Sequence, residues 1–213
     1  MTLIERRSVE TPTGTARIEQ HRPPTPWALL ALTHGAGGGI DAHDLQVLAR
    51  ALPRLGVTVT LIEQPWRVAG RRIAGPPASL DEGYKAVVSS LRSRTPLFVG
   101  GRSAGARVGC RTGRGLGAVG VVALAFPLYP PGRPERSRAE ELSAHGLPVL
   151  VVQGGRDPFG SPVQFPPRVS VVAVPDADHS LKVPKRAATT AEDVDALLVE
   201  SVLAWLRRRS GRD

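Results

Sequence analysis

Short apolar runs alternate with longer stretches of helical periodicity from residue 27 to the end of the chain. The runs cover residues 27–33, 57–62, 97–100, 119–126, 148–153 and 169–174. They lack the strict polar alternation of a strand with one wet face, so we expect strands that are buried on both faces of a parallel sheet. This pattern predicts a three-layer α/β fold, in which helices cover both faces of a mostly parallel sheet of about seven or eight strands.

Several helix boundaries are readable. Ser79-Leu-Asp-Glu82 and Thr189-Thr-Ala-Glu192 fit the capping box, which predicts that helices begin there. In the last helix an apolar stripe is expected to cover one face of the sheet: Val194, Leu197, Leu198, Val202, Trp205 and Leu206. A second leucine stripe precedes Gly56, and Pro53 is expected to shorten that helix. Residues before Trp27 indicate a hairpin around residues 12–14 at a sheet edge.

The size of the chain predicts one domain. Its 213 residues, 41% hydrophobic and 22% charged, are typical of a single globular domain over residues 1–213, with no room for a large cap domain. The longest apolar stretch, 118–126, is too short to span a membrane, and no secretory signal precedes the first strand. The lone Cys110 excludes an internal disulfide, and we expect a cytoplasmic protein.

The net charge of +9 raises the possibility of a nucleic-acid partner. Only Lys85, Lys182 and Lys185 are lysines, and the arginines are spread along the chain. With 4% aromatic residues and no recognisable nucleic-acid-binding motif, the sequence favours a partner other than nucleic acid.

The segment Gly101-Arg-Ser103-Ala-Gly105 has the G-x-S-x-G pattern of a nucleophile elbow. It follows an apolar run and precedes a predicted helix, which is the strand-to-helix turn that the elbow requires. A side chain at position 101 or 105 is expected to collide with a neighbouring strand or helix. We therefore expect Ser103 to be a nucleophile.

A serine nucleophile needs a base and an acid that orients it. His179 follows the run 169–174, at the end of a strand where open α/β sheets place their sites, and is the predicted base. His21, His43 and His145 are less suitably placed. Asp157 follows the run 148–153 and is the predicted acid. Asp176 and Asp178 are weaker alternatives, because they share the loop of the histidine.

The first buried run ends in the glycine-rich segment His34-Gly-Ala-Gly-Gly-Gly39. Such a turn brings backbone N–H groups to a substrate carbonyl, so Ala36 and Ala104 are the predicted oxyanion donors. We expect substrate contacts from His34, Gly35, Arg102 and Trp66, with a bracing role for His34 as the alternative. The stretch 64–79, which contains Trp66, is expected to form a loop near the site entrance.

Five segments resemble one known group, the small lidless α/β-hydrolases related to dienelactone hydrolase. They are His34-Gly-Ala-Gly-Gly-Gly39, Gly100-Gly-Arg-Ser-Ala-Gly-Ala-Arg107, Phe126-Pro-Leu-Tyr-Pro-Pro-Gly-Arg-Pro-Glu135, Gln153-Gly-Gly-Arg-Asp-Pro-Phe-Gly160 and Asp176-Ala-Asp-His-Ser-Leu-Lys182. The branch includes a testis-expressed eukaryotic protein and a subunit of the NSL chromatin complex. The resemblance implies Ser103 as nucleophile, Asp157 as acid and His179 as base. Dienelactone hydrolase itself has a cysteine nucleophile where this chain has Ser103, and Cys110 is expected to serve helix packing.

The leading hypothesis is a serine hydrolase that cleaves small esters, or related acyl bonds, through an acyl-enzyme, with no metal or organic cofactor. One alternative is a catalytically silent binding or scaffold protein with the same fold. A less favoured one is nucleotide or phosphate binding: Gly115-Leu-Gly117-Ala-Val-Gly120 matches a dinucleotide fingerprint, but it precedes a predicted strand where the fingerprint must follow one. The sequence does not decide between a monomer and a homodimer.

Overall fold

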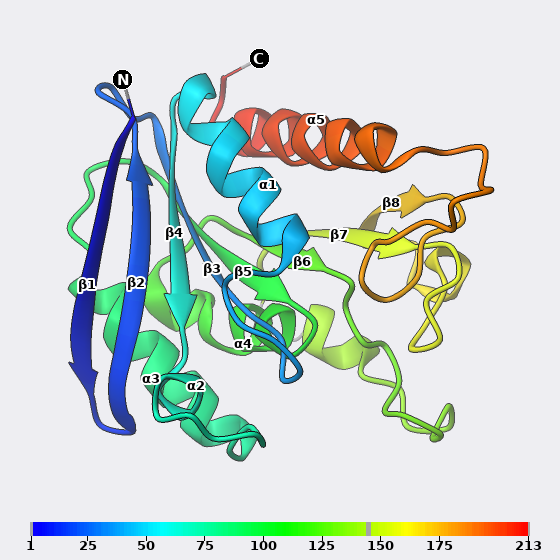
Figure 1. Ribbon diagram of the computed structural model, residues 1–213, viewed down its shortest axis with the longest axis horizontal. Helices are drawn as coiled ribbons and strands as arrows, with labels where there is room; N and C mark the ends of the chain where they lie inside the picture. Colours follow the sequence, from blue (N-terminus) through cyan, green and yellow to red (C-terminus); the bar gives the residue numbers. More distant parts are fainter. Residues whose placement is uncertain (1, 144–145, 213) are drawn as a thin grey trace.

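The computed structural model describes residues 2–143 and 146–212. Within these residues the strands form one sheet of eight, in the order β1-β2-β4-β3-β5-β6-β7-β8 (Figure 1). The strands are β1 (Leu3–Thr11), β2 (Gly14–Arg22), β3 (Ala28–Thr33), β4 (Val57–Glu63), β5 (Leu97–Arg102), β6 (Gly120–Leu124), β7 (Val149–Gly154) and β8 (Ser170–Val174). The predicted α/β class and the mostly parallel sheet are confirmed.

The sheet is antiparallel at one side only. β1 and β2 form the predicted hairpin, with Thr11 opposite Gly14, and β1 is an edge strand. β2 pairs antiparallel with β4, and every pair from β4 to β8 is parallel. Parallel strands bring all their carboxyl ends to one edge of the sheet, where residues from distant parts of the sequence meet.

Helices cover both faces, as the apolar strands require. The helices are α1 (His43–Ala51), α2 (Pro65–Val68), α3 (Pro77–Ser90), α4 (Ala104–Thr112) and α5 (Ala191–Arg209). Figure 1 shows α1 and α5 on one face of the sheet, and α3 and α4 on the other. The buried residues form two corresponding clusters, one under α1 and α5 and one under α3 and α4.

Two predicted helix starts are wrong by one or two residues. α3 begins at Pro77, whose ring fixes a helical φ and whose missing N–H is not needed in the first turn, and Ser79 forms no capping box. In α5 the box joins Thr190 to Asp193, one residue later than predicted, because Asp193 lies at the third helical position after Thr190.

The predicted α5 stripe is confirmed, and the leucine stripe before Gly56 is buried except for its last residue, Leu55, which is 39% exposed. Five of the six α5 residues are buried and Leu197 is partly buried. α1 ends at Ala51, and a 3-10 turn, Leu52–Leu55, contains Pro53 and runs into Gly56 in the left-handed conformation, with φ 86°. The proline shortens the α-helix as expected.

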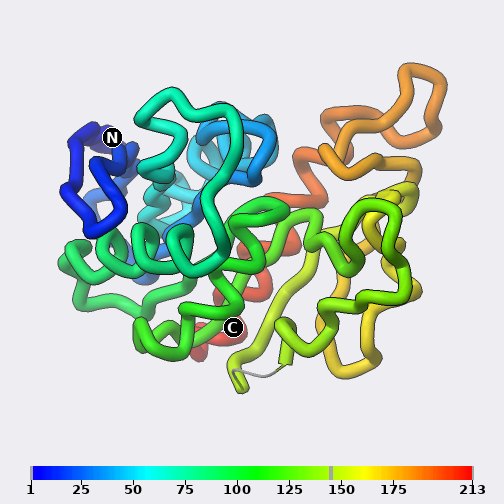
Figure 2. The backbone as a smooth tube through the Cα atoms, turned by 90° about the horizontal axis from the view of Figure 1, so that it is seen from below, coloured from blue at the N-terminus to red at the C-terminus, as the bar shows by residue number. Residues whose placement is uncertain are grey.

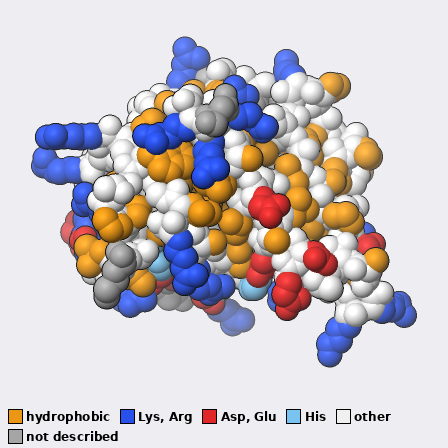
Figure 3. All heavy atoms as spheres, turned by 90° about the horizontal axis from the view of Figure 1, so that it is seen from above, with side chains coloured by type: hydrophobic (Ala, Val, Ile, Leu, Met, Phe, Trp, Pro, Cys, Tyr) orange, Lys and Arg blue, Asp and Glu red, His pale blue; other side chains and the backbone are white. Residues whose placement is uncertain are grey.

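Two surface features are the position of the hairpin turn and the distribution of basic side chains. In the tube view the β1–β2 hairpin turn lies beside the segment between β4 and α3 (Figure 2). On the face that carries α1 and α5, basic side chains lie in several separate groups (Figure 3). Within residues 2–143 and 146–212, every helix is too short or too polar to span a lipid bilayer.

Candidate active site

Ser103 lies on a sharp turn between β5 and α4. Its backbone has φ 53° and ψ −112°, which few non-glycine residues adopt. Its N–H donates to the carbonyl oxygen of Leu124 at 2.9 Å, which ties the turn to the end of β6. This strained turn places the hydroxyl at the carboxyl edge of the sheet, as the nucleophile-elbow pattern predicts.

The two glycines of the pattern have the expected steric reason. A Cβ atom at Gly101 or at Gly105 would collide with the carbonyl oxygen of Thr33, the last residue of β3. Helix α4 and strand β5 therefore approach β3 at a distance that only glycine permits.

Three side chains from separate loops form one hydrogen-bonded chain. Nε2 of His179 lies 3.0 Å from Oγ of Ser103, and Nδ1 of His179 lies 2.8 Å from Oδ2 of Asp157. The Asp157 side chain is fully buried, whereas that of His179 is 21% exposed. The structure thus brings together the three residues that the sequence analysis selected, although 76 residues separate the serine from the histidine.

The aspartate is held by groups that sequence reasoning missed. Gln153 donates through Nε2 to Oδ2 of Asp157 at 2.8 Å and to the carbonyl oxygen of Gly160 at 2.7 Å. The N–H of Phe159 donates to Oδ1 of Asp157 at 2.8 Å, and the Phe159 ring lies edge-on to the His179 ring at 4.6 Å. Both residues belong to the segment 153–160 that carries the family resemblance, which was the available signal.

The other residues considered as the acid or the base have different surroundings. Asp178 accepts the N–H groups of Ser180 and Lys182 within its own loop, and Asp176 is exposed. His21 contacts Glu19 and His43 contacts Asp195. The remaining candidate, His145, lies outside the described residues.

The predicted oxyanion donors flank Ser103. Ala104 is the first residue of α4, where N–H groups lack helical acceptors and the helix dipole favours negative charge. Ala36 lines the same cavity as Ser103, and a Cβ on its neighbour Gly35 would lie 3.2 Å from the Cβ of Ser103. In the described part of the chain neither the Ala36 nor the Ala104 N–H donates a hydrogen bond.

His34 braces the glycine-rich loop instead of facing a substrate. It is 3% exposed, its Nδ1 donates to the carbonyl oxygen of Gly35 at 2.8 Å, and its Nε2 accepts the N–H of Gln64 at 3.0 Å. Burial lowers the pKa of His34, which favours the neutral ring that this pair of contacts requires. The expected substrate contact is therefore wrong, and the alternative role holds.

Trp66 and its segment also differ from expectation. Trp66 is 7% exposed, lies in the short helix α2, packs against the His34 ring at 5.5 Å and lines a different cavity. The apolar ring is buried behind the loop because the segment after β4 folds toward the β1–β2 hairpin and away from Ser103.

Arg102 has structural partners on two sides. Its Nε lies 3.1 Å from Oδ2 of Asp44 in α1, and its Nη2 donates to the carbonyl oxygen of His179 at 2.8 Å. Burial raises the pKa of Asp44, which is 2% exposed, against the opposing attraction of Arg102. Arg102 lines the cavity, as expected of a substrate contact, but its charge is already paired. Asp44 was missed by the sequence analysis.

The cavity at Ser103 has a volume of about 620 Å³. Its walls come from the glycine-rich loop, the start of α1 and the loops that carry Ser103, Phe159 and His179.

Among the described residues no group of three or more His, Cys, Asp or Glu side chains is arranged to hold a metal ion. The segment 115–120 leads into β6 and ends at its first residue, whereas the phosphate turn of a dinucleotide fold must follow a strand, which excludes this segment. Cys110 is buried in α4, as expected of a packing residue.

Known proteins with this architecture include several hydrolases. A lidless α/β serine hydrolase from Xanthomonas campestris is 21% identical, with a TM-score of 0.69 over 95% of this chain and 94% of that chain. The esterase domain of a Rhodothermus marinus protein is 16% identical, with a TM-score of 0.70 over 97% and 98% of the two chains. Dienelactone hydrolase from Anabaena variabilis is 15% identical, with a TM-score of 0.74 over 97% and 98%.

The sequence itself identifies the family. A comparison with curated proteins gives no significant match. The model of the alpha/beta hydrolase domain, however, matches residues 26–207, from the residues before β3 to the last turn of α5. The chain belongs to the alpha/beta hydrolase domain family.

Proposed function

We propose that this protein is a serine hydrolase of small ester or related acyl substrates. The observation that carries the proposal is the hydrogen-bonded chain from Ser103 through His179 to Asp157. Each link is the contact that its chemical step needs: a base within proton-transfer distance of a hydroxyl, and a buried carboxylate that orients the base.

In the proposed reaction Oγ of Ser103 attacks the substrate carbonyl carbon while its proton passes to Nε2 of His179. The carbonyl oxygen becomes an oxyanion, which the N–H groups of Ala36 and Ala104 stabilise. His179 returns the proton to the leaving alcohol as the acyl–oxygen bond breaks. A water molecule then attacks the acyl-enzyme, with His179 again as base, and the acid and free Ser103 are released.

Asp157 has a positioning role in this scheme. Because Oδ2 accepts from Nδ1 of His179, it fixes the tautomer that leaves Nε2 free to accept the serine proton. Gln153 and the N–H of Phe159 hold both carboxylate oxygens, so the carboxylate has little freedom to rotate away from the imidazole.

The choice of an ester among acyl substrates rests on two supports. Structural neighbours include proteins whose names describe an esterase domain and a dienelactone hydrolase, and dienelactones contain an ester bond. The cavity is also open, and its volume suits a small substrate. We further propose that residues 1–213 act as one domain in the cytoplasm, and that the chain belongs to the lidless branch named above.

A fluorophosphonate probe tests the nucleophile. The probe should label the wild-type protein and fail to label Ser103→Ala, and turnover of p-nitrophenyl acetate should fall by roughly a thousandfold or more. Ser8→Ala is the matched control, because Ser8 is an exposed serine on the edge strand β1. Wild-type protein that is folded, never labels and turns over no short-chain aryl ester would favour the silent scaffold.

A further inference from the structure

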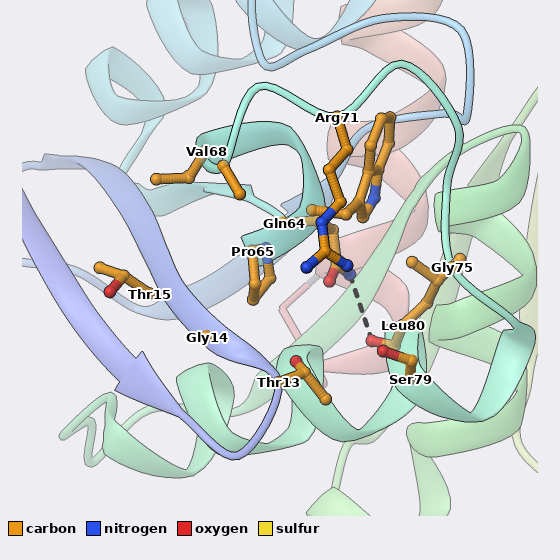
Figure 4. Close-up of a pocket in the computed structure, with 12 residues that line it drawn as sticks. Thr13, Gly14, Thr15, Gln64, Pro65, Val68, Arg71, Gly75, Ser79 and Leu80 are labelled. Carbon is orange, nitrogen blue, oxygen red and sulfur yellow. Dashed lines mark hydrogen bonds between the residues drawn. The ribbon is translucent and has the colours of Figure 1, made fainter.

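The glycine-rich loop is braced on the side that faces away from Ser103. Nε2 of His34 accepts the N–H of Gln64 at 3.0 Å. The Gln64 side chain donates in turn to the carbonyl oxygen of Leu80 at 3.3 Å, the hydrogen bond drawn in Figure 4. These two contacts join the loop to the segment after β4 and to α3, so the loop has supports that do not involve the catalytic histidine.

The loop that carries His179 has a strained backbone. On either side of the histidine, Asp176 and Leu181 are non-glycine residues in the left-handed region, with φ 57° and 54°. Such conformations cost free energy and persist only where surrounding contacts hold them. In the part of the chain that the structure describes, one hydrogen bond reaches the main chain of His179: Nη2 of Arg102 donates to its carbonyl oxygen at 2.8 Å. The main chain that carries the imidazole therefore depends on Arg102.

Arg102 is well placed to fix this loop relative to the nucleophile. It is the last residue of β5 and the covalent neighbour of Ser103. Its side chain is 16% exposed, and a Cβ atom built on Gly35 would lie 3.5 Å from its Nη1, so the guanidinium also lies against the glycine-rich loop. A single side chain, from the strand that leads to the nucleophile, thus contacts the loop of the base and the loop of the predicted oxyanion donor.

Asp44 fixes the direction of this guanidinium. Its Oδ2 lies 3.1 Å from Nε of Arg102, and its carboxylate is buried in the first turn of α1. A guanidinium is planar and its donors form a fixed fork, so an ion pair at Nε sets the direction in which Nη2 points. Asp44 therefore acts on His179 through Arg102.

We propose that Arg102, oriented by Asp44, is a positioning residue that holds the main chain of His179, a role that rests on the proposed hydrolase activity. The contact keeps Nε2 of His179 at 3.0 Å from Oγ of Ser103. A misplacement of about 1 Å in an active site costs about a hundredfold in rate. Because Arg102 touches none of the reacting atoms in this scheme, its loss should lower kcat and leave KM nearly unchanged.

The Asp44→Asn variant is the background in which Arg102 is tested. An asparagine keeps the shape of the aspartate without its charge, so removal of Arg102 then leaves no unpaired buried carboxylate. Arg102→Met in this background should lower kcat for p-nitrophenyl acetate about 30- to 100-fold relative to Asp44→Asn alone, with KM within about threefold. Circular dichroism should show that both variants are folded, which separates the positioning role from a loss of stability.

Proton NMR gives a readout that does not require turnover. The proton on Nδ1 of His179 lies in a hydrogen bond to Asp157. It gives a separate downfield signal only while that hydrogen bond protects it from exchange with water, and the signal is assigned by its absence from His179→Ala. It should be present in Asp44→Asn and weakened or lost in Asp44→Asn, Arg102→Met.

Another partly buried ion pair supplies the matched control. Arg111 of α4 pairs with Asp81 of α3, and their side chains are 22% and 18% exposed. The double variant Arg111→Met, Asp81→Asn removes an arginine and a carboxylate in the same way, but on the face of the sheet opposite α1. It should leave kcat within about twofold of the wild type and the Nδ1 signal intact.

Three results would overturn the proposal. One is an Nδ1 signal in Asp44→Asn, Arg102→Met that equals the signal of Asp44→Asn. Another is a kcat within about threefold of Asp44→Asn, and a rise in KM alone would then make Arg102 a substrate contact. The third is an equal loss in the control variant, since any broken ion pair would then disturb the site.

The proposed hydrolase activity can fail separately. A wild-type protein that gives the Nδ1 signal but hydrolyses no ester would contradict that activity, and the NMR comparison alone would then decide the role of Arg102. Conversely, turnover that persists unchanged without Arg102 would refute its positioning role and leave the hydrolase activity standing.

Discussion

Replacement of Arg102 by methionine should destabilise the protein in a pH-dependent way. Arg102 is the last residue of β5, and its guanidinium is the partner of the buried carboxylate of Asp44. Methionine keeps much of the apolar stem of arginine but removes the charge and the hydrogen bond to the carbonyl oxygen of His179. Asp44 is then left at 2% exposure without a counter-charge.

The loss in free energy of unfolding is set by the protonation of the Asp44 carboxylate. A buried carboxylate without a partner becomes protonated, because burial disfavours its charged form. Protonation at a pH above the ordinary aspartate pKa of about 3.9 costs free energy. At 1.36 kcal/mol per pH unit this costs up to about 4 kcal/mol at pH 7 and about 1.5 kcal/mol at pH 5. The lost hydrogen bond to His179 adds about 1 kcal/mol at either pH.

The sign of the pH dependence is fixed by where the proton binds. In Arg102→Met the folded protein holds a proton on Asp44 that the unfolded chain releases above its own pKa. The folded state therefore binds more protons, and stability falls as pH rises between the unfolded and folded pKa values. Burial already raises the pKa of Asp44 in the wild type, against the opposing attraction of Arg102. Part of the cost is therefore present before the substitution, and about 4 kcal/mol is the upper limit of the change.

Urea denaturation followed by circular dichroism at pH 5 and pH 7 measures the loss of stability and its dependence on pH. The double variant Arg102→Met, Asp44→Asn removes the charge that needs the proton, so it should regain most of the pH-dependent loss. An equal destabilisation of Arg102→Met at the two pH values would refute this reasoning. A double variant no more stable than Arg102→Met at pH 7 would do the same.

Three further changes test the site and the core. Asp157→Asn should lower kcat for p-nitrophenyl acetate by roughly 10³- to 10⁴-fold, because an amide no longer fixes the tautomer of the histidine; a loss below tenfold would contradict the proposed role. Gly105→Ala should cost about 1–3 kcal/mol in urea denaturation, because its Cβ meets backbone oxygens, whereas Gly115→Ala, which faces open space, should be neutral and serves as its control. Trp205→Ala should cost about 3–5 kcal/mol by the same method, because the ring is 1% exposed and packs edge-on to Phe98; a cost below 1 kcal/mol would mean that this face of the core collapses around the gap.

The sequence determined the layers and the order of the site. Strands buried on both faces must be apolar along their whole length, so each central strand was visible as a continuous run. The chemistry of Ser103, Asp157 and His179 was predictable for a related reason: each residue lies at most five residues after the end of such a strand, and parallel strands bring those ends to one edge. The starts of α3 and α5 were less well determined, because overlapping capping patterns compete within two residues.

Tertiary structure alone decided which side chains meet across that edge. Asp44 and Gln153 resemble ordinary polar residues in the sequence, and only the packing of α1 and β7 against the site loops makes them partners of Arg102 and Asp157. Trp66 was misplaced for the same reason, since the direction in which its segment folds after β4 depends on the hairpin that it packs against. The pattern of apolar and polar residues within one segment shows which side chains are buried and where a strand ends, because both properties depend on residues that are neighbours in the sequence. Contacts between distant segments depend on distances that no single segment contains.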